Sequence, residues 1–145
     1  MSGKNYNHQL DARNRMRIPA KYREELGAGY TITLGVGGCL SVYTKEEMDK
    51  LRKLLTNLNG FRESQIKAAR YLLSNSWEAE EDNQGRILLP ENLRNYAKIV
   101  KNVVVCKGPT NIEIWSEEVY KEYFKDVSFE DLADAIDLLK NDGRV

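Results

Sequence analysis

The sequence predicts an α+β fold in which two tandem copies of one unit form a pseudo-twofold β-barrel with flanking helices. Three observations favour it: the chain is self-similar after a shift of 71 residues, short β-rich runs precede glycine turns, and capping residues open amphipathic segments. The strands of one copy are too few and too short to bury an apolar face alone. We therefore expect the second copy to complete the barrel.

The internal repeat centres on a turn in which an aspartate precedes an arginine by four residues. The shift superposes its charged residues and prolines, pairing Asp11 with Asp82, Arg15 with Arg86, Pro19 with Pro90 and Arg23 with Arg94. It also superposes apolar positions, pairing Met16 with Ile87, Ile18 with Leu89 and Tyr22 with Leu93. Two diverged copies of one unit explain this pattern better than chance does.

The expected strands follow the same order in both copies. A short strand lies on each side of the Asp-x-x-x-Arg turn, and the runs 30–34 and 102–106 are rich in β-branched residues. Residues 40–43 and 112–115 alternate as strands do. The stretch 35–38 has three glycines but lacks the rest of a phosphate-binding loop, so it predicts a hairpin turn.

Helices are expected wherever capping residues precede apolar periodicity. Pro19 and Pro90 are placed at first helical positions, where their fixed φ suits a helix start. Thr44 and Glu47 form a capping box before a helix whose apolar face contains Met48, Leu51, Leu54, Leu55 and Leu58. A second helix is expected from Ser64 to about Leu73. A third is capped by Ser128 with Asp131 and is apolar at Leu132, Ala135, Ile136 and Leu139.

These elements divide the chain into four segments. We expect a first copy at 4–58, a helical linker at 59–74, a second copy at 75–125, and a C-terminal helix and tail at 126–145.

Composition excludes several classes of protein. The 145 residues are 41% hydrophobic, and 22 basic residues balance 22 acidic ones. No run approaches the ~18–20 apolar residues that cross a bilayer, so we expect a cytoplasmic protein without membrane contact. Two distant cysteines and one histidine are too few ligands for zinc, and no pattern marks a nucleophile. We therefore expect no enzyme, no metal and no cofactor.

The charges are unevenly distributed. Residues 6–23 carry five basic residues against one acid, whereas the matching residues 77–94 carry two against five. Residues 113–145 carry ten acids against four bases. Arg13, Arg15 and Arg17 alternate along one expected strand, which would place them on one face ~6.5–7 Å apart, a spacing that suits DNA phosphates. The first copy is therefore the candidate nucleic-acid contact.

The two turns also have a structural interpretation. Asn14 and Gly85 occupy the position where a positive φ is expected, and the aspartates Asp11 and Asp82 can stabilise the turns. Each aspartate can pair with the arginine of its own turn or with that of the other copy. The acidic surroundings of Arg86 favour a structural role for it.

The residues at 5–11, 15–23, 39–43, 82–90 and 112–115 together closely resemble the bacterial MraZ family. The resemblance covers about Lys4 to Phe124. It implies the swapped-hairpin AbrB class, with two AbrB-like repeats per chain and ring-shaped homo-oligomers. It further implies a nucleoid-associated regulator, usually a repressor, that binds short direct repeats in the promoter of the division and cell-wall gene cluster containing its own gene. Many members have glycine where this chain has Asn14, which can keep the same geometry.

Charge and resemblance together assign the candidate DNA contacts. Arg13, Asn14 and Arg15 are expected in a groove, Arg17 and Lys21 on phosphates, and Arg86 as a second-tier contact. Two alternatives come from other classes: an antidote of the same fold, which would need a disordered toxin-binding tail, and an architectural ring that acts through protein partners.

Overall fold

The computed structural model describes residues 5–143, and it is an α+β structure as expected. Lys4, Arg144 and Val145, which belong to the predicted outer segments, lie outside the described residues. The first half contains β1 (Tyr6–Gln9), β2 (Arg15–Arg17), α1 (Ala20–Leu26), β3 (Thr31–Leu34), β4 (Leu40–Tyr43), α2 (Lys45–Leu55) and α3 (Glu63–Ser74). The second half contains β5 (Trp77–Glu78), β6 (Arg86–Leu88), α4 (Glu91–Ala97), β7 (Asn102–Lys107), β8 (Ile112–Ser116), α5 (Glu117–Phe124) and α6 (Phe129–Asn141).

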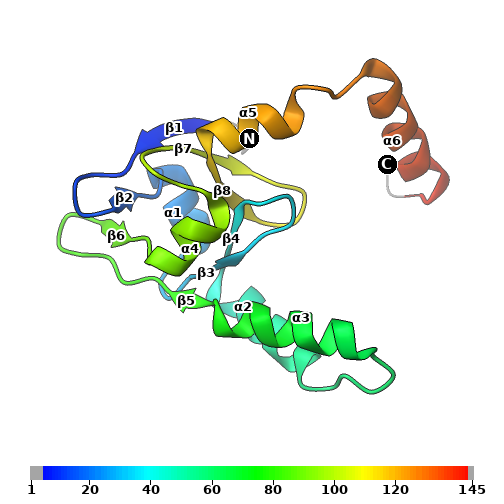
Figure 1. Cartoon of the computed structure of the whole chain (residues 1–145), viewed down its shortest axis with the longest axis horizontal. Helices are drawn as coiled ribbons and strands as arrows, with labels where there is room; N and C mark the ends of the chain where they lie inside the picture. The colour runs from blue at the N-terminus through cyan, green and yellow to red at the C-terminus, as the bar shows by residue number, and fades with distance from the viewer. Residues whose placement is uncertain (1–4, 144–145) are drawn as a thin grey trace.

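The two halves of the chain share one antiparallel sheet. Its six strands run in the order β1-β7-β8-β4-β3-β5, and the pairs β1–β7, β4–β8 and β3–β5 each join the first half to the second (Figure 1). Each strand of the first half has a repeat-related strand in the second half: β5 for β1, β7 for β3 and β8 for β4. When each strand is replaced by its repeat-related strand, the strand order reads in reverse. Because three pairs cross between the halves, neither half holds its strands in place alone.

The predicted closed barrel is wrong. The sheet ends at β1 on one side and at the two-residue β5 on the other, and these edges do not pair. β2 and β6 hydrogen-bond to each other as a separate two-stranded ribbon. A barrel requires continuous hydrogen bonding around its circumference. Here each chain half leaves the sheet at its aspartate turn, so the sheet stays open.

One hydrophobic core lies between the sheet, the β2–β6 ribbon and the short helices α1 and α4. The repeat-related residues Tyr22 and Leu93 are fully buried on α1 and α4, and Met16 and Ile87 are buried opposite each other on the ribbon. The apolar positions that the 71-residue shift superposes therefore meet in a single core. Its burial against both halves supplies the main stabilisation of the body.

The helix starts agree closely with the capping residues. The Thr44 hydroxyl accepts a hydrogen bond from the Glu47 amide at 3.0 Å and the Glu47 carboxylate accepts one from the Thr44 amide at 2.8 Å. Ser128 and Asp131 form the same capping box before α6. Pro19 and Pro90 differ by one position from the expectation. Their ψ values of 138° and 153° are extended, so each is an N-cap and its helix begins at the next residue.

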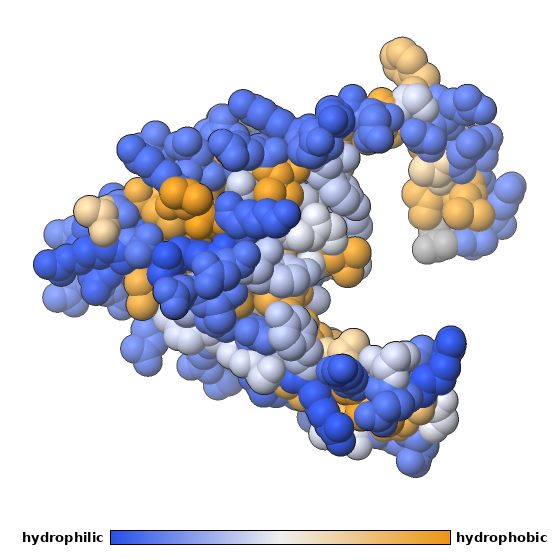
Figure 2. All heavy atoms as spheres, viewed as in Figure 1, coloured by the Kyte–Doolittle hydropathy of each residue, from blue (hydrophilic) through white to orange (hydrophobic). Residues whose placement is uncertain are grey.

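Helices α2 and α3 form an arm that projects from the body (Figure 1). Of the apolar face expected on α2, Met48 is buried, but Leu54 is 71% exposed and the helix ends before Leu58. On the other side of the molecule, a short non-helical connection joins α5 to α6, which also projects beyond the body. The two projections leave an open space between them, visible in Figure 2.

Candidate nucleic-acid interface

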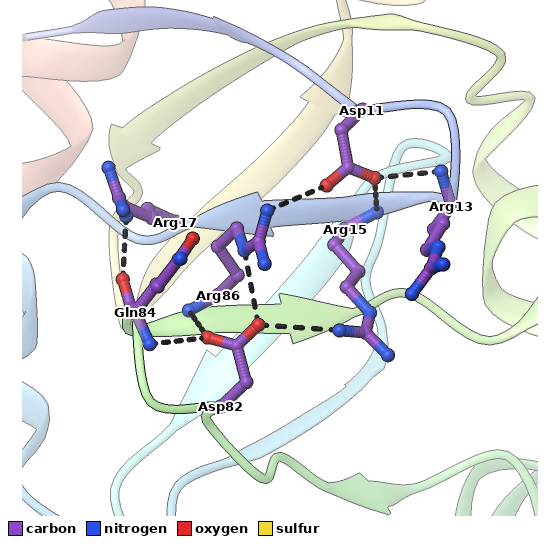
Figure 3. A network of polar contacts seen from close by, with 7 residues as sticks. All are labelled: Asp11, Arg13, Arg15, Arg17, Asp82, Gln84 and Arg86. Carbon is purple, nitrogen blue, oxygen red and sulfur yellow. Dashed lines mark hydrogen bonds and ion pairs between the residues drawn. The ribbon is translucent and has the colours of Figure 1, made fainter.

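The two aspartate turns lie together at one end of the molecule, where β2 and β6 pair (Figures 1 and 3). The antiparallel register places Arg15 opposite Leu88, Met16 opposite Ile87, and Arg17 opposite Arg86. Met16 and Ile87 fill the core side of this ribbon. The arginines therefore lie on the outer side, above a fully apolar layer.

The first turn is closed by Asp11. Its carboxylate oxygen Oδ1 accepts hydrogen bonds from the backbone amides of Arg13 at 2.8 Å and Arg15 at 3.0 Å. Asn14 has a φ of 61°, in the left-handed region that asparagine tolerates better than most residues. Its carbonyl accepts a hydrogen bond from Leu89 at 3.0 Å, so the first turn is also anchored to the second half.

The second turn repeats this geometry. Oδ1 of Asp82 accepts hydrogen bonds from the amides of Gln84 at 2.8 Å and Arg86 at 2.9 Å. Gly85 has a φ of 76° at the position that matches Asn14. The positive φ expected at both positions is confirmed. The two turns are thus equivalent in backbone although their neighbouring charges have opposite sign.

The remaining oxygens of both aspartates face arginines across the ribbon (Figure 3). Nη1 of Arg15 lies 3.3 Å from Oδ2 of Asp82, and Nη1 of Arg86 lies 3.6 Å from Oδ2 of Asp11. Nε of Arg86 also donates to Oδ2 of Asp82 within its own turn at 3.1 Å. Both pairings that the sequence left open therefore occur. Arg86 contacts two carboxylates and Arg15 contacts one.

These bonds hold the pKa values of the aspartates below their ordinary range. The amide hydrogen bonds from Arg86 and Gln84 lower the pKa of Asp82 to about 2, helped by the Arg86 side chain. The amide hydrogen bond from Arg15 is the largest cause of the lowered pKa of Asp11. Both carboxylates are therefore ionised at neutral pH, and each balances part of the arginine charge.

The candidate contact residues occupy different environments from those that strand alternation predicts. Arg13 lies in the turn, not on the strand, because the Asp11 hydrogen bonds and the left-handed Asn14 end the extended backbone before β2 begins. Arg15 is only 34% exposed and is held by Asp82. Arg17 is exposed, and its Nε donates to the Gln84 carbonyl at 2.7 Å. Lys21 is exposed on α1.

Arg13 has the least restrained guanidinium of this group. Among residues 5–143, no hydrogen bond or ion pair of its side chain is found, and Figure 3 draws contacts to its backbone only. The seven residues of Figure 3 include four arginines and two aspartates, a net charge of +2. The surface thus combines a rigid ribbon with outward cationic groups, an arrangement suited to an anionic polymer.

A second link between the halves was not expected from sequence. Arg23 on α1 makes two hydrogen bonds to the Glu81 carboxylate at 2.7 and 2.9 Å, and the Tyr30 hydroxyl donates to the same carboxylate at 2.9 Å. Its repeat-related residue Arg94 instead donates to the Leu89 carbonyl. The only sequence feature that indicated this link was an acid, Glu81, directly before Asp82. It could not be assigned to Arg23 without the tertiary structure, because 58 residues separate them.

Comparison with known proteins assigns the family. A family model described as "MraZ protein, putative antitoxin-like" matches residues 1–69 and 72–139. The chain belongs to the MraZ family. Each matched segment contains one of the two aspartate turns, and the second reaches into α6.

Individual MraZ relatives match most of the chain. A protein named "Transcriptional regulator MraZ" from Thermoanaerobacter sp. (strain X514) is 44% identical over 91% of this chain and 94% of its own length. Proteins of the same name from Caldanaerobacter subterraneus and Clostridium acetobutylicum are 42% and 45% identical, over 91% and 81% of this chain and 94% and 83% of their own lengths. Within the part of this MraZ chain that the structure describes, no helix is long and apolar enough to span a membrane.

Proposed function

We propose that this protein is a sequence-specific transcriptional regulator, acting as a repressor, that binds short direct repeats in the promoter of the division and cell-wall gene cluster containing its own gene. The exposed cations at the β2–β6 ribbon contact the DNA. The names of the relatives support a regulator of transcription, and the family supports the choice of promoter.

The observation that carries the proposal is that some charged residues of the ribbon are paired with one another whereas others extend to solvent. Asp11 and Asp82 are occupied by backbone amides and by Arg15 and Arg86, whereas Arg13 and Arg17 extend from the same rigid frame toward solvent. Phosphate contacts need exposed cations in a fixed position, and base contacts need a narrow element that enters a groove. The first turn provides both.

The details of the contact follow from this exposure. Arg13 and Asn14, at the tip of the first turn, contact base edges, and Arg17 and Lys21 contact phosphates. Arg15 and Arg86 hold the two turns together and reach DNA only with their outer nitrogen atoms. The second turn lacks an arginine at the position that matches Arg13, where Gln84 stands instead.

One such surface makes few phosphate contacts and binds weakly on its own. A ring of identical chains presents several first turns to successive promoter repeats one helical turn (~10 bp) apart, so that binding of one turn raises the effective concentration of the next. Assembly thereby converts weak contacts into a specific affinity.

A footprint of the purified full chain on its own upstream region tests the proposal. Protection of direct repeats, with affinity at least ~10²-fold higher for several repeats than for one, is the expected result. A scrambled fragment of equal length and base composition serves as the control. Equal binding to both fragments would reject sequence-specific regulation, and so would the absence of binding to either fragment. If neither fragment is bound although the assembly is intact, a function through protein partners becomes the better interpretation.

A further inference from the structure

The outer face of the central strands β4 and β8 forms the floor of a pocket. The antiparallel register places Ser41 opposite Glu113 and Leu40 opposite Ile114. Leu40 and Ile114 are fully buried in the core, so strand alternation directs Ser41 and Glu113 to the other side of the sheet. There they line a pocket of about 490 Å³, a size typical of small-molecule sites.

The walls of this pocket come from both sides of the open space between the projections. The arm contributes Leu51 of α2 and Leu72 of α3, and α5 contributes Tyr123 and Phe124. The rings of Tyr123 and Phe124 pack against Trp115 with centroid distances of 5.1 and 5.6 Å, and they remain 50% and 44% exposed. The recess between the projections in Figure 2 therefore has apolar walls with accessible aromatic rings.

Glu113 supplies the charge of the pocket, and the fold fixes its carboxylate in place. No other charged residue is found among the described residues that line the pocket. Oε1 of Glu113 accepts a hydrogen bond from Nε1 of Trp115 at 2.9 Å. A Cβ on Gly108 would overlap Oε2, so only glycine leaves room for the carboxylate at that position. Glu113 is therefore a positioned group, in contrast to a solvated surface acid.

This half-buried carboxylate has no counter-charge within residues 5–143. No lysine, arginine or histidine of that part of the chain pairs with it, and Lys107, the cation nearest in sequence, pairs with Glu25 at 3.1 Å. The thiols of Cys39 and Cys106 stay uncharged, because burial, helped by the Glu113 charge, raises their pKa values to about 12 and about 11. A carboxylate that loses water without gaining a cationic partner favours a cation from outside the chain.

We propose that this pocket binds a free organic ammonium ion, with the ammonium group at Glu113 and an alkyl chain along the apolar walls. The carboxylate has acceptor sites beyond the one that Trp115 occupies, and the rings of Tyr123 and Phe124 attract cations through their faces. Anionic ligands are disfavoured because no basic residue of the described part of the chain lines the pocket. This inference goes beyond the proposed function, since the pocket is built without the β2–β6 ribbon.

Three probes of equal chain length test the charge preference: n-hexylammonium, n-hexanol and hexanoate. Each is titrated into the native protein at neutral pH, at constant ionic strength and without DNA. NMR monitors the indole N–H signal of Trp115, which a Trp77→Phe variant distinguishes from that of the other tryptophan. We expect n-hexylammonium to bind roughly tenfold more tightly than n-hexanol, and hexanoate to give no saturable shift. Equal affinities for the three probes, or no saturation by n-hexylammonium, would overturn the proposal.

A change of one side chain tests the ammonium site itself. Glu113→Gln removes the charge but keeps an oxygen that can accept from Trp115. We expect this variant to bind n-hexylammonium as weakly as n-hexanol, with the affinity for n-hexanol unchanged. Glu118→Gln, at an exposed acid of α5 that does not line the pocket, is the matched control and should bind n-hexylammonium like the native protein. Circular dichroism melting verifies that both variants are folded, and native n-hexylammonium affinity in Glu113→Gln would contradict the assignment.

Light scattering during the same titration determines whether the pocket is free in the protein as it exists in solution. We expect the mass to stay constant at saturation with n-hexylammonium. A mass that falls with saturation would mean that the probe displaces another copy from the pocket, which would overturn a site for a free ligand. Charge-selective binding of n-hexylammonium by a protein that fails the promoter footprint would reject the proposed function and leave this site intact.

Discussion

Arg13 and Arg15 are two residues apart, but their side chains make different contacts. Arg15 is held by Asp82 across the ribbon, whereas Arg13 extends from the turn with only its backbone engaged. A residue without side-chain contacts can be changed without loss of stability. Arg13 is therefore the position at which the proposed DNA contact and folding can be tested separately.

We expect Arg13→Ala to weaken promoter binding by ~1–3 kcal/mol, roughly 5- to 150-fold, with no change in melting temperature. Fluorescence anisotropy with a repeat-containing promoter fragment measures the affinity. Lys53→Ala, which removes the same charge at an exposed position on α2 of the arm, is the control and should retain nearly native affinity. Equal losses in both variants would mean that overall charge, and not this turn, governs binding.

Asp82 makes the ribbon sensitive to acid. Its folded pKa of about 2 lies below its ordinary value of 3.8, so its contribution to stability is complete above about pH 4 and is lost as the pH falls toward 2. Asp82→Asn removes this dependence, and we expect the melting temperature of the variant to fall less steeply than that of the native protein between pH 4 and 2. Asp126→Asn, at an exposed carboxylate on the α5–α6 connection, should melt with the native slope.

The two turns, as elements, share a backbone but differ in the residue at the left-handed position. A Cβ on Gly85 would lie 3.5 Å from the Arg23 guanidinium, an ordinary contact, so only the φ of 76° opposes a side chain there. We expect Gly85→Ala to lower the free energy of unfolding by about 1–2 kcal/mol, as the left-handed conformation costs an L-residue.

The matched change in the first turn should behave differently. Asn14→Gly removes the strain of a left-handed φ of 61° in the folded state, but it also raises the conformational entropy of the unfolded chain. Because these effects oppose each other, we expect the free energy of unfolding to change by less than about 0.5 kcal/mol. Chemical denaturation of both variants measures the two effects. A Gly85→Ala protein as stable as the native one would show that the second turn can change its conformation.

The ion pairs of the ribbon predict that the two arginine-to-alanine variants differ in how much stability they lose. Arg15→Ala removes one ion pair and leaves Asp82 with Arg86. Arg86→Ala removes the ion pairs to both Asp11 and Asp82, so we expect it to lower the melting temperature more than Arg15→Ala does. Both side chains are about one-third exposed, which limits the energies. Melting curves and promoter affinity measured together decide the order. Equal destabilisation by both variants would contradict it.

At the scale of the whole molecule, the proposed ring makes DNA affinity depend on how many chains engage the promoter together. If Arg17 and Lys21 of one chain neutralise two phosphates, log K should fall with log salt at a slope of roughly −1.8 per engaged chain, and more steeply for a promoter with several repeats. Titrations at four or more salt concentrations measure the slope. A slope near zero would exclude phosphate contact by this surface.

Local sequence determined those features that depend on neighbouring residues. The capping boxes at Thr44 and Ser128, the left-handed positions at Asn14 and Gly85, and the apolar positions of the core follow from short-range hydrogen bonding and periodicity. The presence of two related turns was also visible in the sequence, because repeat-related residues have the same spacing in both copies.

Tertiary structure alone decided how the copies meet. Arg15 and Asp82 are 67 residues apart, and which carboxylate each arginine contacts depends on the β2–β6 register, which no local pattern encodes. The sheet stays open because its edge strands are short and the ribbon pairs separately. Likewise, periodicity alone marks α6 as amphipathic but cannot say that its apolar face remains exposed, since burial is decided by what the rest of the chain places beside it.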